Sequence, residues 1–171
     1  FSTDKITRVG CMAHIRRKFD EAYKAEKKHP LALEVLGMIR ELYAVEKQAR
    51  EKELSHEQRL KLRQSQSAPV MEKLKARITE IRLKPTVLPK SQLGKACNYA
   101  LGQWEAIKHY LNNGHVEIDN NSCERSIRPV AIGRKNWIHI GSENAGPKIA
   151  GIISIVETCL KLEIRPRDYL K

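Results

Sequence analysis

The chain has few aromatic side chains and no long hydrophobic run. Aromatic residues make up 5% of its 171 residues, and hydrophobic residues make up 41%. No apolar stretch approaches the roughly 20 residues that a membrane-spanning helix needs, and the N-terminal residues lack the apolar core of a secretory signal. The length is sufficient for one hydrophobic core that folds without disulfides or metals. These absences predict a soluble, cytoplasmic protein with no membrane partner.

Cysteines are also few and widely spaced. Cys11, Cys97, Cys123 and Cys159 include no paired C-x-x-C motif. This spacing argues against a disulfide framework and against a structural zinc knot, and it favours reduced, mostly buried thiols. Cys11 and His14 form one C-x-x-H half-site, but zinc needs two further ligands, and no residues have the matching spacing. We therefore do not expect a zinc site there.

Acidic residues are scarce relative to basic ones. The chain has 32 Lys and Arg against 20 Asp and Glu, which gives a formal charge of +12. Such a charge favours polyanionic partners, because Lys and Arg that contact phosphates release condensed counterions. The alternative is a well-solvated helical surface, because glutamates are interleaved with lysines through most of the first 80 residues. Composition alone suggests nucleic acid as a partner without establishing it.

Hydrophobic periodicity predicts a mainly helical chain. Apolar residues at helical spacing predict helices that begin near Met12, Pro30, Ser55, Pro69 and Ser91. The helix from Ser55 carries a capping box with Gln58 and is expected to end near residues 65–68. Prolines predict a boundary loop over residues 84–90. The stripe from Ser91 to Asn113, which includes Trp104 as a core residue, predicts one continuous helix.

The sequence changes character after Gly114. A cluster of cap-type residues at 119–122 predicts the start of another helix. Pro129 should interrupt that helix, because proline lacks a backbone donor and disfavours helical geometry at the preceding residue. Residues 133–140 are then expected to be extended. An apolar stripe over residues 149–160 predicts a last long helix.

Residues 119–137 are the most informative stretch for function. A structural interpretation is that Asn121 and Glu124 form a capping box, in which the carboxylate satisfies a backbone N–H. The functional interpretation rests on one carboxylate at a helix start, flanked by Arg125 and Arg128, with more basic and amide side chains soon after. Hard oxygen ligands hold Mg²⁺ while cationic and amide donors position a phosphodiester. The spacing leaves both interpretations open.

Three blocks of the sequence together carry a family resemblance. They are Cys11-Met12-Ala13-His14-Ile15-Arg16-Arg17-Lys18-Phe19, Ser91-Gln92-Leu93-Gly94-Lys95-Ala96 with Gln103-Trp104-Glu105-Ala106, and Ile118 to Trp137. In their order and spacing these blocks resemble the transposases of the bacterial insertion sequence 66 family, from about Val9 to the C-terminus. Met12 stands where the family usually has Trp, which we interpret as a packing change.

The resemblance implies a DDE-type transposase with a ribonuclease H-like catalytic domain. In such enzymes two aspartates and one glutamate hold two Mg²⁺ or Mn²⁺ ions for DNA strand cleavage and strand transfer. By motif, the catalytic and metal-ligating glutamate is Glu124. The implied DNA contacts, to transposon ends and target, are Asn120, Asn121, Arg125, Arg128, Arg134, Lys135 and Asn136. Trp137, His14 and Arg17 are weaker candidates.

The chain departs from the family pattern at the two aspartates. Both should lie upstream of the Cys-x-Ala-His block, the second followed by Gly-Tyr. Asp4 does not match, because Lys5 follows it and it lies only seven residues before Cys11. We therefore expect the C-terminal part of a longer transposase, which carries one of three metal ligands. One carboxylate binds Mg²⁺ weakly, so this chain alone is expected to bind no metal tightly and to neither cleave nor join DNA.

The expected fold class is mainly α, the helical C-terminal portion of a ribonuclease H-like domain with at most one or two short strands. Residues 1–88 are expected to form a strand remnant at 6–11 and a helical insertion, 89–140 a helix pair with the glutamate motif, and 141–171 a terminal helix and tail. Helices that lack their sheet expose an apolar face, so a homo-oligomer is expected. The alternatives are a non-catalytic basic helical module that binds DNA or protein, and a purely structural role.

Overall fold

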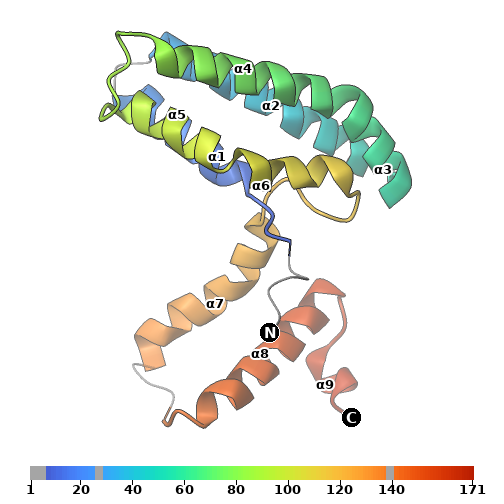
Figure 1. Ribbon diagram of the computed structural model, residues 1–171. Coiled ribbons are helices and arrows are strands. Elements are labelled where there is room, and N and C mark those ends of the chain that lie inside the picture. The colour runs from blue at the N-terminus through green and yellow to red at the C-terminus, as the bar shows by residue number, and fades with distance from the viewer. Residues whose placement is uncertain (1–6, 26–28, 138–140) are drawn as a thin grey trace. The chain divides into compact units, whose positions relative to one another are not determined.

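The computed structural model describes residues 7–25, 29–137 and 141–171 (Figure 1). Within these ranges the chain forms helices and no strands. The helices are α1 (Met12–Ala25), α2 (Pro30–Glu51), α3 (His56–Leu62), the π-helical η2 (Arg63–Ser67), α4 (Ala68–Leu83), α5 (Gln92–Gly102), α6 (Trp104–Lys108), the 3₁₀-helical η3 (His109–Asn112), α7 (Asn121–Trp137), α8 (Ala145–Lys161) and α9 (Pro166–Tyr169). The mainly α fold class is confirmed. Residues 7–11 of the expected strand have no regular structure, and Ile6 lies outside the described residues.

The chain divides into two compact units, Phe1–Asn120 and Asn121–Lys171. We call them the bundle unit and the tail unit. The division into three parts at residues 88 and 140 stays a prediction. No helix in the described part of the chain is long and apolar enough to cross a membrane.

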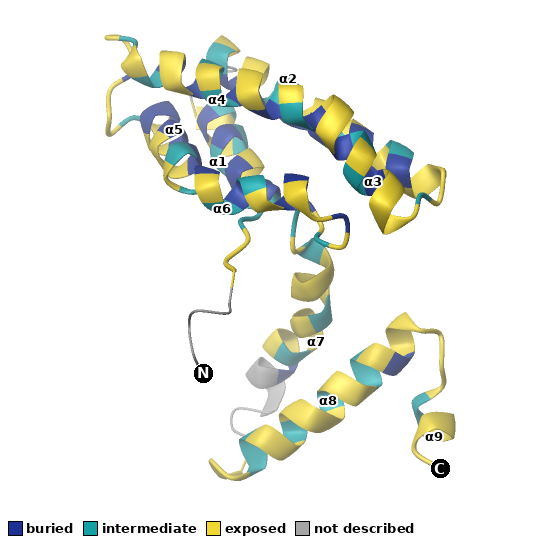
Figure 2. Cartoon of the chain, turned by 45° about the vertical axis from the view of Figure 1, so that its right-hand side comes forward, coloured by how far each residue is buried: buried dark blue, intermediate teal, exposed yellow. Residues whose placement is uncertain are grey.

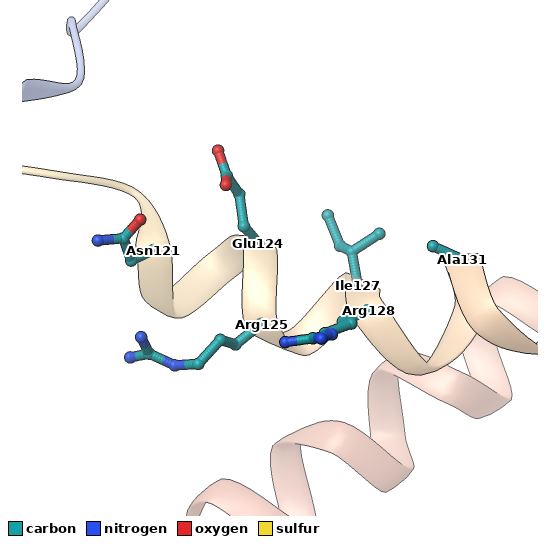
Figure 3. Close-up of a pocket in the computed structure, with 6 residues that line it drawn as sticks. All are labelled: Asn121, Glu124, Arg125, Ile127, Arg128 and Ala131. Carbon is teal, nitrogen blue, oxygen red and sulfur yellow. The ribbon is translucent and has the colours of Figure 1, made fainter. Parts of the chain in front are cut away.

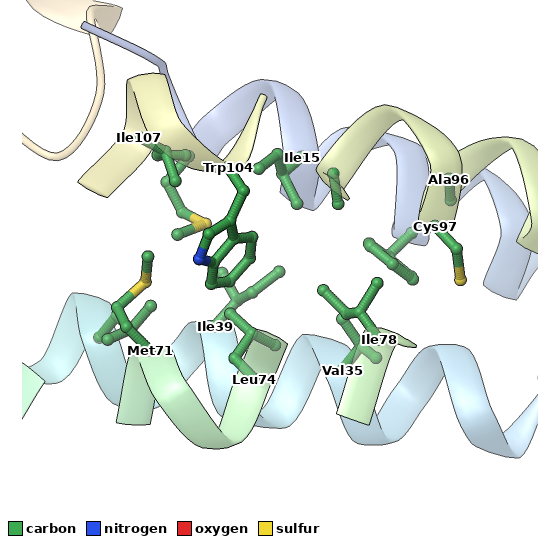
Figure 4. Close-up of a cluster of buried hydrophobic side chains, with 14 of the residues drawn as sticks. Ile15, Val35, Ile39, Met71, Leu74, Ile78, Ala96, Cys97, Trp104 and Ile107 are labelled. Atoms are coloured by element: carbon green, nitrogen blue, oxygen red, sulfur yellow. The ribbon is translucent and has the colours of Figure 1, made fainter. Parts of the chain in front are cut away.

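The bundle unit is built from four helices that pack in a ring. α1 packs against α2 and α5, and α4 packs against the same two helices. The predicted apolar stripes supply its core, which includes Met12, Phe19, Ile39, Leu74, Ile78, Leu93, Cys97 and Ile107. Trp104 points from α6 toward Met71, Leu74 and Ile39 (Figure 4), and it is 2% exposed. Its assignment as a core residue is confirmed.

The four cysteines are free thiols, and the predicted burial holds for two of them. Cys97 and Cys159 are buried, Cys11 is half-buried, and Cys123 is exposed on α7. Burial raises the pKa of the Cys97 thiol to about 11, so this side chain is a neutral part of the core.

The prediction of one continuous helix from Ser91 to Asn113 is wrong, because the helix is interrupted at Gln103. α5 ends at Gly102, and Gln103 adopts φ −97° and ψ 1° before α6 and η3 continue the segment. Glycine is a poor helix former, and the Gln103 side chain accepts a hydrogen bond from Arg8 Nη2 at 2.7 Å. The predicted cap at Ser91 is confirmed, because its hydroxyl accepts from the Gly94 N–H at 3.0 Å.

The helix that begins after Ser55 does not end near residues 65–68 as predicted. It continues through the π-helical turn η2 into α4, and this turn carries the buried side chains of Arg63 and Ser67. The guanidinium of Arg63 donates to both oxygens of Glu46 at 2.8 Å. Its Nη1 donates to the carbonyls of Tyr110 at 2.9 Å and Asn113 at 2.7 Å. In this turn Arg63 and Ser67 are buried, while the three polar residues between them are exposed. The burial of Arg63 is tolerated because its guanidinium is paired with Glu46 and with two carbonyls.

Arg59, one turn earlier on α3, extends this ionic group. Its Nε and Nη2 donate to Glu46 Oε2 at 3.1 and 2.8 Å. Its Nη1 and Nη2 donate to Glu117 at 2.7 and 2.6 Å, and Arg59 lowers the pKa of Glu117. We call Glu46, Arg59, Arg63 and Glu117 the buried ionic cluster, although Glu117 itself is half exposed. A buried charge is tolerated when it is paired and hydrogen-bonded, which this geometry achieves.

The tail unit has little core of its own. Among its described residues, Cys159 is the one hydrophobic side chain in the buried class, at 2% exposure. Figure 2 shows that its helices are mostly exposed. The exposed apolar residues are Ile127, Ile132, Ile152, Ile155, Leu160, Leu162, Ile164, Tyr169 and Leu170. An exposed surface this apolar indicates an interaction surface.

Arg63→Ala should destabilise the bundle unit by about 3–5 kcal/mol, because Glu46 loses one of its two buried partners and two carbonyls lose a donor. Urea unfolding of the 171-residue chain, followed by circular dichroism, measures this change. Arg77→Ala is the matched control, because Arg77 pairs with Glu34 on an exposed face. If Arg63→Ala and Arg77→Ala unfold at the same urea concentration, the structural role of the buried ionic cluster is contradicted.

The exposed apolar face of the tail unit should make the isolated chain self-associate. Size-exclusion chromatography with light scattering should show a dimer or larger species, and Ile152→Lys with Ile155→Lys should shift it toward the monomer. Leu33→Lys, at an exposed leucine of α2, is the control and should leave the mass unchanged. A wild-type chain that is monomeric at high concentration contradicts this expectation.

Candidate functional site

Glu124 lies in the first turn of α7, as the sequence predicts for a helix that starts after residue 120. Asn121 is the first helical residue and is half-buried, and Asn120 before it is exposed. Glu124 is exposed, and it and Asn121 each take part in a polar interaction. This placement is compatible with both interpretations of Glu124, the helix cap and the metal ligand.

The early turns of α7 bring together an acid and two arginines. Glu124 and Ile127 point to one side of the helix, and Arg125 and Arg128 point to another (Figure 3). An open pocket of about 550 Å³ is lined by Asn121, Glu124, Arg125, Ile127, Arg128 and Ala131. Both arginines are exposed. The arrangement can therefore offer a carboxylate to a cation and guanidinium groups to phosphates from the same stretch of helix.

The expected interruption at Pro129 is wrong. α7 runs through this proline, and residues 133–137, which were expected to be extended, are its last turn. Residues 138–140 lie outside the described part. Proline removes one backbone donor, but Pro129 is exposed, so water can satisfy the carbonyl that loses its partner.

For the other predicted DNA-contact residues, the structure describes less. Arg134, Lys135 and Asn136 belong to α7, but their side chains lie outside the described set, as does that of Trp137. His14 is half-buried and Arg17 is exposed, and both lie on α1 in the bundle unit. The structure thus gathers Asn121, Glu124, Arg125 and Arg128 in one pocket. The roles of all these residues stay predictions.

Sequence reasoning missed the contact of Asp119 with Tyr43. The Tyr43 hydroxyl donates to Asp119 Oδ2 at 2.8 Å across a separation of 76 residues. Burial raises the pKa of Tyr43 far above its ordinary value, and the hydrogen bond to Asp119 raises it further. No local pattern signals this pair, because Tyr43 belongs to the apolar stripe of α2.

The donor chemistry at the start of α7 fits one part of a magnesium site. Glu124 and Asn121 carry the hard oxygen atoms that Mg²⁺ prefers. No group of three His, Cys, Asp or Glu side chains that could hold an ion occurs among the described residues. Metal binding by Glu124 therefore stays a prediction.

A family model described as Transposase IS66 family matches residues 1–148. The chain belongs to the IS66 family of transposases. This finding confirms the resemblance carried by the three sequence blocks.

The relatives of this IS66-family chain include three proteins of Sinorhizobium fredii (strain NBRC 101917 / NGR234). The uncharacterized protein y4jD is 36% identical over 160 residues, which cover 94% of this chain and 30% of y4jD. The uncharacterized protein y4hP is 32% identical over 176 residues, 96% of this chain and 31% of y4hP. The uncharacterized protein y4qI is 34% identical over 171 residues, 99% of this chain and 30% of y4qI. The chain thus spans about 30% of the length of these relatives. No solved structure matches.

If Arg125 and Arg128 of this IS66-family chain contact phosphates, replacing both with Ala should weaken duplex DNA binding at every sequence tested. Filter binding over a salt series should show the slope of log affinity against log salt reduced by about 1 for each lost contact. Arg77→Ala is the control, because that arginine is already neutralised by Glu34 and Glu80. An unchanged slope in the double variant would exclude these contacts.

Proposed function

We propose that this chain is part of a DDE-type DNA transposase that performs metal-dependent strand cleavage and strand transfer, with Glu124 as the glutamate of its triad. The observation that carries the proposal is the pocket on α7, in which Glu124 lies with Asn121, Arg125 and Arg128 in a chain of the IS66 family. An acid beside two guanidinium groups suits a phosphodiester substrate, because it offers a cation ligand next to anion-binding groups.

In this proposal each group has a defined task. Glu124 offers one oxygen ligand, and Arg125 and Arg128 hold phosphates on the neighbouring side of α7. Asn120, Asn121, Arg134, Lys135 and Asn136 add contacts to the DNA of the transposon ends and target. In the complete enzyme, Mg²⁺ or Mn²⁺ ions supply Lewis-acid stabilisation to the entering and leaving oxygens.

We infer that the active enzyme is longer than this chain. The relatives are about three times as long, and no group of three His, Cys, Asp or Glu side chains that could hold a metal ion occurs among the described residues. The apolar residues exposed on the tail unit support the same inference, because a ribonuclease H-like sheet would give them a surface to pack against. The chain alone is expected to be inactive.

A second candidate function is a non-catalytic DNA-binding module. The bundle unit has a complete core of its own, and the chain carries an excess of basic residues. Such a module would bind the phosphate backbone of DNA through its basic side chains. Its function would not require the carboxylate of Glu124.

Glu124→Gln in the longer transposase separates the two functions. Strand transfer should fall by at least about 100-fold, because the amide is a poor cation ligand, while affinity for terminal DNA should stay near that of wild type. Glu72→Gln, an exposed glutamate of α4, is the control and should keep full activity. A Glu124→Gln enzyme that transfers strands at the wild-type rate would contradict the proposed function and favour the module.

A further inference from the structure

The segment between η3 and α7 lacks regular secondary structure but is held to the bundle unit at several points. We call residues 113–120 the anchored segment. Arg63 Nη1 donates to the Asn113 carbonyl at 2.7 Å, and Arg59 binds both oxygens of Glu117 at 2.7 and 2.6 Å. The buried ionic cluster therefore holds the anchored segment at Asn113 and Glu117.

Backbone packing adds two more contacts. A Cβ atom placed on Gly114 would lie 1.9 Å from the carbonyl oxygen of His56, so this close approach requires glycine. The Met12 N–H donates to the Ile118 carbonyl at 3.0 Å, and the Ile118 side chain is 2% exposed. The anchored segment is thus packed against α1 as well as α3.

The last contact before α7 is the hydrogen bond from Tyr43 to Asp119. Both side chains are half-buried, and their oxygens are 2.8 Å apart. Because the phenol keeps its proton at neutral pH, it remains a hydrogen-bond donor. Its electrostatic neighbours are Cys11, which raises the pKa of Tyr43, and Arg16, which lowers it. After Asp119, only Asn120 precedes the first residue of α7.

We propose that Tyr43 is a positioning residue for Glu124, because its hydrogen bond to Asp119 orders the last residues of the bundle unit, from which the chain continues into α7. This inference rests on the function proposed above for Glu124. Asp119 lies five residues before Glu124. A side chain that acts on a reacting centre must be held within roughly 0.5 Å, and a misplacement of about 1 Å can cost about 100-fold in rate.

The first test uses the 171-residue chain and needs no metal. In Tyr43→Phe, backbone amides of residues 118–124 should exchange with solvent roughly 2- to 10-fold faster, the effect of one lost hydrogen bond, while the amides of α4 stay protected. Tyr99→Phe, which removes a hydroxyl from the surface of α5, is the matched control and should change neither set.

A double-mutant cycle identifies the partner of the hydroxyl. Asp119→Ala removes the acceptor, so adding Tyr43→Phe to it should cause no further increase in exchange at residues 118–124. Additive effects, or an unchanged exchange rate in Tyr43→Phe, would overturn the proposal. A uniform loss of protection that includes α4 would also overturn it, because the tyrosine would then act on overall stability.

The second test uses the longer transposase and separates this inference from the function on which it rests. Tyr43→Phe should lower the rate of strand transfer by about 10-fold and leave the affinity for terminal DNA unchanged, and Tyr99→Phe should keep the wild-type rate. If Glu124→Gln is inactive and Tyr43→Phe is as fast as wild type, the positioning role fails while the proposed function stands. If Glu124→Gln is active, the proposed function itself fails.

Discussion

The structure of the bundle unit depends on the pairing of two arginines with one buried glutamate. Glu46 is inaccessible to solvent, and a carboxylate in that position is stable only because Arg59 and Arg63 both donate to it. The same guanidinium groups reach Tyr110, Asn113 and Glu117, which precede α7 in the chain. The ionic pairing thus joins α2, the α3–η2 turn and the anchored segment. As a result, the segment that leads to Glu124 belongs to the bundle unit.

The two units differ in how completely they bury their apolar residues. The bundle unit packs the expected stripes against one another in one hydrophobic core. The tail unit buries Cys159 but leaves Ile152, Leu160 and Leu162 exposed. The chain spans about 30% of the length of its relatives, and an exposed apolar surface of this kind indicates an interaction surface.

Local patterns in the sequence predicted the parts of the fold that depend on local interactions. The Ser55 capping box with Gln58 forms as expected, and the stripe residues Met71, Leu74 and Ile78 are all fully buried. Met12, predicted to act in packing, is also fully buried. Helix periodicity and capping depend on neighbours within a few residues, which is why one sequence reveals them.

The missed features depend on contacts between distant residues. Arg63 reads as an ordinary surface arginine in a polar stretch, and only the approach of Glu46 and the 110–113 carbonyls explains its burial. The contact of Tyr43 with Asp119 is equally invisible in local sequence. Proline disfavours a helix interior, but α7 continues through Pro129. The loss of one backbone hydrogen bond on an exposed face does not end this helix. For the candidate site, the motif predicted which residues share α7, but the sequence alone did not predict how they point.

We propose above that the Glu124 carboxylate is a cation ligand in the complete enzyme and not only a cap for its own helix. The most direct measurement is a crystal structure of the longer transposase bound to terminal DNA and Mn²⁺, with the anomalous signal used to locate the metal. The account predicts a metal peak about 2.1 Å from a Glu124 oxygen, the distance typical of such hard cations. A bound metal with Glu124 turned away from it and hydrogen-bonded to the first amides of α7 would contradict the account.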